Sequence, residues 1–193
     1  MRGWHRSGTG LALLVLGSSA WGGVIIVDSQ GGGQFTDLQM AVNAAQDGDT
    51  LLVRQGAYSS FLIDGKALTI AADTGAAVTV SGTVTVRNLT VGHTVALSGL
   101  IVTGTTTTSM ADAPGTGLIA TGNGGPVRAQ DCRFEGARGI GDGTGDINNC
   151  CDLQLHHWGW HAAMLDSNSA GVAFVGCTLV GGRGANANVN CYC

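Results

Sequence analysis

The chain contains little charge, a single lysine and only two prolines. Charged residues make up 11 % of its 193 residues, and the lysine is Lys66. A sequence with so few basic residues lacks the electrostatic footprint of a nucleic-acid-binding protein. Its hydrophobic content of 44 % is too high for an intrinsically disordered chain. Outside the N-terminus, no apolar run reaches the ~20 residues of a membrane span.

Glycine, in contrast, is abundant. The 33 glycines follow no three-residue period, which excludes a collagen-like chain. Together with frequent threonine and valine, they favour many short strands joined by tight turns. The formal net charge of −4 is mildly acidic and predicts a soluble protein rather than a binder of charged polymers.

Residues 1–20 have the pattern of a secretory signal peptide. The positive segment contains Arg2, His5 and Arg6, and the short apolar core is 11–16. Small residues at 18–20 precede the expected cleavage point. This pattern predicts export to the cell envelope, the periplasm or the medium, with no membrane span in the mature chain. An uncleaved anchor is the alternative.

Residues 37–46 are the one segment with a clear helical pattern. Thr36 and Gln39 fit a capping box with Thr36 as the N-cap, and Phe35 and Met40 fit the accompanying hydrophobic staple. Leu38, Val42 and Ala45 share one face, and Gly48 suits the left-handed position after the helix. An amphipathic helix of this kind has to cover an apolar surface.

After Asp49 the sequence changes to short apolar runs separated by Gly, Asn, Asp or Ser. The runs are 51–53, 61–63, 68–70, 78–80, 84–86, 89–91, 95–97 and 100–102. They are shorter than the strands of an ordinary β-sandwich, which average ~5–6 residues. They predict an all-β solenoid in which each coil consists of a few short strands. Residues 50–182 would hold about six coils of ~22 residues.

A repeat supports the solenoid. The repeat consists of a valine, a turn-forming residue, a small apolar residue and a larger apolar residue at equal spacing. It occurs in segments 95–104, 127–136 and 172–181, and 146–153 is a weaker copy. The turn-former is Gly99, Asp131 or Gly176, which suits a left-handed bend. The residue after it would point inward, so Leu100, Cys132, Cys151 and Cys177 would form an interior ladder.

Six cysteines in an exported chain ordinarily indicate disulfides. In the ladder, however, equivalent residues of adjacent coils would lie ~4.8 Å apart, farther than the ~3.8 Å between Cβ atoms that a disulfide prefers. We therefore expect buried thiols at these positions, with disulfides as the alternative. Cys191 and Cys193 are too close together to pair, which leaves a bridge to Cys150 or to another chain.

The N-terminal segments carry a family resemblance. Residues 27–28, 32–39, 47–53 and 56–58 resemble the N-terminal cap and first coil of right-handed parallel β-helix proteins of the pectin lyase-like superfamily, which includes pectinesterases and many bacterial surface proteins. The detailed likeness covers 24–73, and the repeat extends it to about 182. The resemblance implies that the helix at 37–46 plugs the N-terminal end of the solenoid.

The catalytic motifs of that superfamily are missing. The Asp-Phe-hydrophobic-Phe-Gly element of pectinesterases and the Gly-His-Gly and Arg-Ile-Lys elements of polygalacturonases do not occur. A lyase or esterase for acidic glycans would need an arginine and two carboxylates converging on one face. The candidates for such a site are Arg128, Asp131, Arg133, Glu135, Arg138, Asp142 and Asp146.

Two segments are candidate binding sites. Asp142 and Asp146 flank a glycine-rich loop and could bind calcium through oxygen ligands, or simply form a solvated turn. Residues 156–161 combine histidines with two tryptophans, whose faces suit the apolar sides of sugar rings. The carbohydrate-binding candidates are Trp158, Trp160, His156, His157, His161 and Asp166. A structural flap over the solenoid and a transition-metal site are the alternatives for this segment.

The sequence therefore predicts a signal peptide (1–20), an N-terminal strand and capping helix (21–49), parallel β-helix coils (50–182) and an irregular tail (183–193). The expected function is that of an exported, non-catalytic module that contacts polysaccharide or a surface protein, without a cofactor. A polysaccharide lyase or esterase and a fragment of a longer solenoid are the alternatives. An open solenoid end would also favour end-to-end self-association.

Overall fold

The computed structural model describes residues 22–105, 115–137 and 161–182. Its elements in chain order are β1 (Val24–Val27), α1 (Leu38–Ala44), β2 (Thr50–Val53), β3 (Gly56–Asp64), β4 (Leu68–Ala72), β5 (Val78–Arg87), β6 (Val95–Ser98), β7 (Leu100–Thr103), β8 (Leu118–Thr121), β9 (Val127–Gln130), β10 (Arg133–Glu135), β11 (Ala163–Asp166), β12 (Val172–Val175) and β13 (Thr178–Val180). The chain is therefore mainly β, with one short helix. In the described part, no helix is long and apolar enough to cross a membrane.

All the strands pair in parallel, in two sheets that form three stacks. Stack A consists of β1, β2, β4, β6, β9 and β12, in that order. In the second sheet β5 is bent, so that 78–81 pairs with β7 and 84–87 pairs with β8. The first halves of β3 and β5 form stack B with β7, β10 and β13, and their second halves form stack C with β8 and β11.

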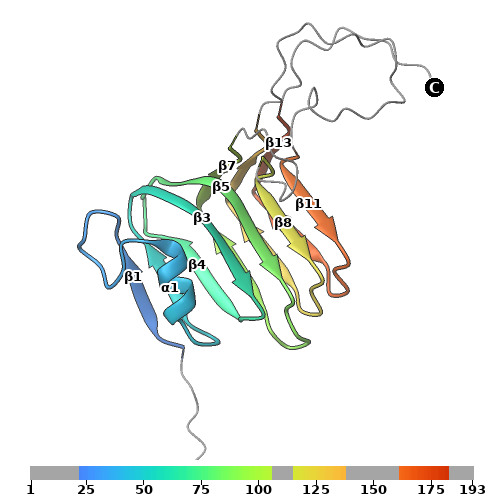
Figure 1. The fold of residues 1–193 in the computed structure, drawn as a ribbon, viewed down its shortest axis with the longest axis horizontal. Helices are drawn as coiled ribbons and strands as arrows, with labels where there is room; N and C mark the ends of the chain where they lie inside the picture. The colour runs from blue at the N-terminus through green and yellow to red at the C-terminus, as the bar shows by residue number, and fades with distance from the viewer. Residues whose placement is uncertain (1–21, 106–114, 138–160, 183–193) are drawn as a thin grey trace, which may run out of the picture.

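The chain passes through the stacks repeatedly in the order A, B, C, and we call one such passage a rung (Figure 1). Successive residues of a strand face opposite sides of its sheet, so one set in each strand faces inward. The inward residues of all three stacks belong to one hydrophobic cluster. Leu51, Ile70 and Leu97 represent stack A, Val80, Val102 and Phe134 stack B, and Val86 and Ala120 stack C. The core is therefore a column of in-register apolar side chains.

The expected strand runs match the structure with two exceptions. Runs 78–80 and 84–86 are the two halves of the single strand β5. Residues 89–91 form no strand, because Asn88 has a φ of 58° and ends β5 just before them. Within 50–182, stack A contains five strands of the described chain, fewer than the six coils expected. The difference arises because the connections from β7 to β8 and from β10 to β11 are long.

The corner between stacks A and B was predicted correctly from the repeat. Gly99, Asp131 and Gly176 all adopt left-handed conformations, with φ of 70°, 52° and 63°. The strands that begin after these corners are in register, because Arg133 on β10 lies opposite Ile101 on β7 and Thr178 on β13. The residues directly after the turn-formers are therefore aligned as well. Leu100 and Cys132 are buried, and Cys177 is half-buried.

Both described cysteines of this ladder are free thiols, and burial raises the pKa of Cys132 to about 11. The backbone N–H of Cys132 donates to Cys177 Sγ at 3.4 Å. Cys151 lies outside the described residues. β10 pairs directly with β13, so Cys132 and Cys177, which precede these strands, are neighbours in the ladder.

Helix α1 buries the expected apolar face but begins differently. Leu38, Val42 and Ala45 are buried, and so is Ala41. The N-cap is Asp37, whose Oδ1 accepts from the backbone N–H of Met40 at 2.9 Å, so the capping box at Thr36 was a wrong prediction. Aspartate is a better N-cap than threonine, and the side chain of Gln39 is engaged elsewhere.

The helix ends before the predicted position. Its C-cap is Ala45 in an extended conformation, so Gly48 is not the residue that terminates it. Instead, the ammonium group of Lys66 donates to the carbonyls of Val42, Asn43 and Ala45 at 2.8–2.9 Å. These carbonyls lie at the negative end of the helix dipole, where a cation is stabilising. The single lysine of the chain therefore fixes the helix to the turn after β3.

Candidate functional site

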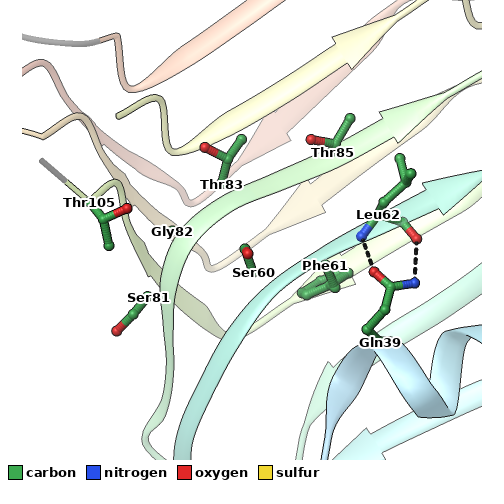
Figure 2. A pocket seen from close by; sticks show the side chains of 9 residues that line it. All are labelled: Gln39, Ser60, Phe61, Leu62, Ser81, Gly82, Thr83, Thr85 and Thr105. Atoms are coloured by element: carbon green, nitrogen blue, oxygen red, sulfur yellow. Dashed lines mark hydrogen bonds between the residues drawn. The ribbon is translucent and has the colours of Figure 1, made fainter. Parts of the chain in front are cut away.

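A groove lies on the outside of the corner between stacks B and C, where β3 and β5 bend. Its volume is about 310 Å³. The lining residues come from α1, β3, β5 and the end of the connection after β7: Gln39, Ser60, Phe61, Leu62, Ser81, Gly82, Thr83, Thr85 and Thr105. Figure 2 shows Thr83 and Thr85 projecting from β5, with Ser60 on the neighbouring strand β3. Five hydroxyl groups thus surround one small groove.

Backbone geometry creates this groove. Register shifts between Ser59 and Phe61, where β3 bends. In β5 the bend occurs at Gly82, which has a φ of 105°. A Cβ atom at this position would lie 2.9 Å from Ser60 Cβ, too close for ordinary contact. Glycine is therefore required both by its backbone conformation and by the close approach of β3.

One wall of the groove is held rigid by a side-chain amide. Gln39 Oε1 accepts from the backbone N–H of Leu62 at 2.7 Å, and Gln39 Nε2 donates to the Leu62 carbonyl at 3.2 Å (Figure 2). The amide thereby pairs with the outer edge of β3 as a neighbouring strand would. No charged side chain is among the described residues that line the groove, so this lining suits a neutral, hydrogen-bonding ligand.

A charged row follows the outer edge of stack C. Asp64, Arg87, Thr121 and Asp166 lie opposite one another on successive strands. Arg87 Nη2 and Nε donate to Asp64 Oδ2 at 2.8 and 3.0 Å, and Asn88 Nδ2 donates to Asp64 Oδ1 at 2.8 Å. The hydrogen bond from Asn88 and those from Arg87 lower the pKa of Asp64 below its usual 3.8.

The structure describes two of the residues predicted from the histidine- and tryptophan-rich segment. His161 and Asp166 are both exposed; His161 lies two residues before β11, and Asp166 is the last residue of this strand. His156, His157, Trp158 and Trp160 lie outside the described residues, as do Asp142 and Asp146. Among the described residues, no three His, Cys, Asp or Glu side chains form a group suited to a metal ion.

The described candidates for an enzymatic site are distributed over different faces. Arg128 lies on β9 in stack A, whereas Arg133 and Glu135 lie on β10 in stack B, where they pair with each other. Asp131 occupies the corner between these stacks. Arg138 lies outside the described residues. Among the described members of this set, the one ion pair is that between Arg133 and Glu135.

Sequence reasoning missed both the groove and a buried asparagine pair. Asn123 is buried, and its amide bonds Leu89 N–H, the Val86 carbonyl and Asn168 Oδ1 at 2.7–3.0 Å. Asn123 and Asn168 each follow a left-handed residue, Gly122 or Ser167, so they occupy equivalent positions. The sequence signal for this pair was a small residue, able to adopt a left-handed conformation, directly before each asparagine. The serines and glycine at 59–60 and 81–82 gave no comparable signal for the groove.

Comparisons with protein-family models, with curated proteins and with solved structures found no match to this chain.

Proposed function

We propose that the three stacks are the sides of a right-handed parallel β-helix. The constant order of the stacks supports this proposal, since each rung returns to stack A next to the strand it left. Connections between parallel strands of one sheet are right-handed in about 98 % of known cases. An experimentally determined structure tests the winding, and left-handed rungs would contradict it.

We propose further that the chain, exported through its residues 1–20, binds a neutral polysaccharide at the cell surface and catalyses no reaction. The observation that carries this proposal is the uncharged groove with its five hydroxyl groups. Hydroxyl and amide groups pair with sugar hydroxyls, and the volume falls at the lower end of the ~300–1,000 Å³ range of ligand pockets. A charged glycan would lack a counter-ion among the lining residues.

The dispersed charges support binding without catalysis. A lyase or esterase needs acid–base groups within hydrogen-bond reach of one reacting bond. Arg128 and Arg133 lie on different stacks, and Arg133 is already paired with Glu135. A protein ligand remains the alternative outcome of the binding experiment.

The experiment compares two threonine variants on a panel of neutral glucans, mannans and xylans, with polygalacturonate as the acidic probe. Thr85 lines the groove on β5, and Thr69 is an equally half-buried threonine on β4 of stack A. We expect Thr85→Trp to fill the groove and weaken binding at least about tenfold, which corresponds to ~1.4 kcal/mol. Thr69→Trp should bind as the natural chain does.

Two results would contradict the proposal. One is the absence of binding to every neutral polysaccharide. The other is the release of unsaturated or de-esterified product from the acidic probe. The Trp158→Ala and Trp160→Ala variants test separately whether these tryptophans contribute to sugar binding. Their effects should add to that of Thr85→Trp only if they contact the same ligand.

A further inference from the structure

Two thiols lie on adjacent rungs in equivalent surroundings, and the groove does not use them. Cys132 and Cys177 directly precede the paired strands β10 and β13, so they are separated by one strand spacing of ~4.8 Å. The backbone N–H of Cys132 donates to Cys177 Sγ at 3.4 Å, so this sulfur lies against the neighbouring rung. Each thiol also donates to the carbonyl two residues before it, Cys132 to Gln130 at 3.3 Å and Cys177 to Val175 at 3.5 Å.

This spacing separates the two sulfurs by the length of a bridged pair. Equal contacts on in-register rungs give the two side chains the same orientation, so their sulfurs also lie about ~4.8 Å apart. A disulfide needs an S–S bond of ~2.05 Å and prefers Cβ atoms ~3.8 Å apart. An ion midway between the sulfurs would lie ~2.4 Å from each, close to the ~2.3 Å of a zinc–thiolate bond.

The surroundings of the pair select a soft ion that needs few ligands. Cys132 belongs to the hydrophobic core cluster, and Cys177 packs against it. Ca²⁺ and Mg²⁺ require oxygen ligands, and a structural Zn²⁺ takes four ligands. Among the described residues, no three His, Cys, Asp or Glu side chains form a group for a metal ion. Thiolates favour Cu(I), for which two ligands suffice. We propose that Cys132 and Cys177 bind one Cu(I) ion between them.

Binding displaces the protons of both thiols. Burial raises the pKa of Cys132 to about 11, and hydrogen bonding to the Leu100 backbone opposes this rise. Cys132 is therefore protonated at neutral pH until a metal ion deprotonates it, as metals do with coordinating thiols. One Cu⁺ replaces two protons, so the neutral pair becomes a complex with a single negative charge. The N–H of Cys132 beside Cys177 Sγ stabilises this charge.

The test measures Cu(I) binding to the reduced chain without oxygen, in competition with a chromogenic Cu(I) chelator. The cysteines outside the pair are first replaced by serine, namely Cys150, Cys151, Cys191 and Cys193. We expect one Cu(I) per chain and a thiolate-to-copper charge-transfer band in the ultraviolet. Cys132→Ala and Cys177→Ala should each weaken binding at least about a hundredfold, or ~2.8 kcal/mol.

A relocated pair tests whether the spacing is the cause. Leu100 precedes β7, which pairs with β10, so it occupies the ladder position next to Cys132 on the other side. In the Cys177→Ala chain, Leu100→Cys should restore one Cu(I) per chain. The matched control is Ile101→Cys, which places the thiol on the outer face, where Ile101 is 37 % exposed. It should restore nothing.

Three results would overturn the proposal. The first is equal Cu(I) affinity of the paired chain and its single-cysteine variants. The second is a disulfide between Cys132 and Cys177 in the chain purified without reductant. The third is a Leu100→Cys variant that binds no better than its Cys177→Ala parent while circular dichroism shows it folded. If that variant unfolds, the single-cysteine comparison decides. None of these results affects polysaccharide binding in the groove, which lies between β3 and β5.

Discussion

The strand edges and the apolar core are covered differently at the two ends of the stacks. At the N-terminal end, the edge of β3 is bonded by the Gln39 amide, the edge of β1 by Gln34, and the core is covered by the apolar face of α1. At the C-terminal end, the described chain leaves β11, β12 and β13 with one neighbour each. The inward side chains there are only partly covered.

This difference implies a gradient of local stability along the stacks. Residues with few buried apolar contacts open at lower free energy than residues of a packed core. The rungs near α1 should therefore form the stable body of the protein, and the rung of β12 and β13 its most easily opened part.

The largest test of this gradient compares two leucines that face the same core. Leu51 in the first complete rung is fully buried, and Leu179 in β13 is 47 % exposed. We expect Leu51→Ala to lower the free energy of unfolding by about 2–5 kcal/mol, because it leaves a cavity. Leu179→Ala should cost less than about 1 kcal/mol, because solvent already reaches the site.

Urea unfolding measures both values. Equal losses for the two variants would show that the last rung is as well packed as the first.

The sequence predicted much of this fold because the fold is repetitive. The left-handed corner at Gly99, Asp131 and Gly176 was visible as a turn-former at a constant offset in three segments. Short apolar runs separated by Gly, Asn, Asp or Ser identified most strands. The spacing between rungs was not predictable, because the segments between β7 and β8 and between β10 and β11 differ in length.

The candidate site was much less predictable. Histidine and tryptophan attract attention as chemically distinctive residues, but of that segment the structure describes His161, which precedes β11, and Asp166, which ends it. The groove depends on Ser60 and Gly82, common residues whose role arises from the register of two strands. Such a site follows from three-dimensional pairing, which no single segment encodes.

A smaller effect concerns the first turn of α1, at the N-terminal end of the stacks. Asp37 is the N-cap of α1, and its carboxylate bonds Met40 N–H. We expect Asp37→Ala to destabilise the protein by about 1 kcal/mol. Thr36→Ala is the control, since the neighbouring threonine does not cap the helix, and its effect should stay within about 0.5 kcal/mol. Thermal unfolding measures both, and the reverse order would restore the capping box at Thr36.

The smallest expected effect concerns acid stability and again compares the two ends. Asp64 on β3 binds Arg87 and Asn88, which hold its pKa below 3.8 in the folded protein. A carboxyl with a depressed pKa contributes stability above its unfolded value of ~3.9, and this contribution disappears as the pH falls through the folded value. Asp64→Asn should therefore flatten the loss of stability below about pH 4.

Asp166 provides the matched control for this measurement. It occupies the equivalent position on β11 at the C-terminal end of the stacks, but the residue opposite it is Thr121 instead of an arginine. Asp166→Asn makes the same change in charge without removing an arginine pair, so we expect the acid profile to keep its slope. Denaturant titrations between pH 3 and pH 7 compare the two variants. Equal flattening of the stability–pH profile by both variants would show that net charge, and not the Asp64–Arg87 pair, controls acid stability. The two ends of the stacks would then not differ in this respect.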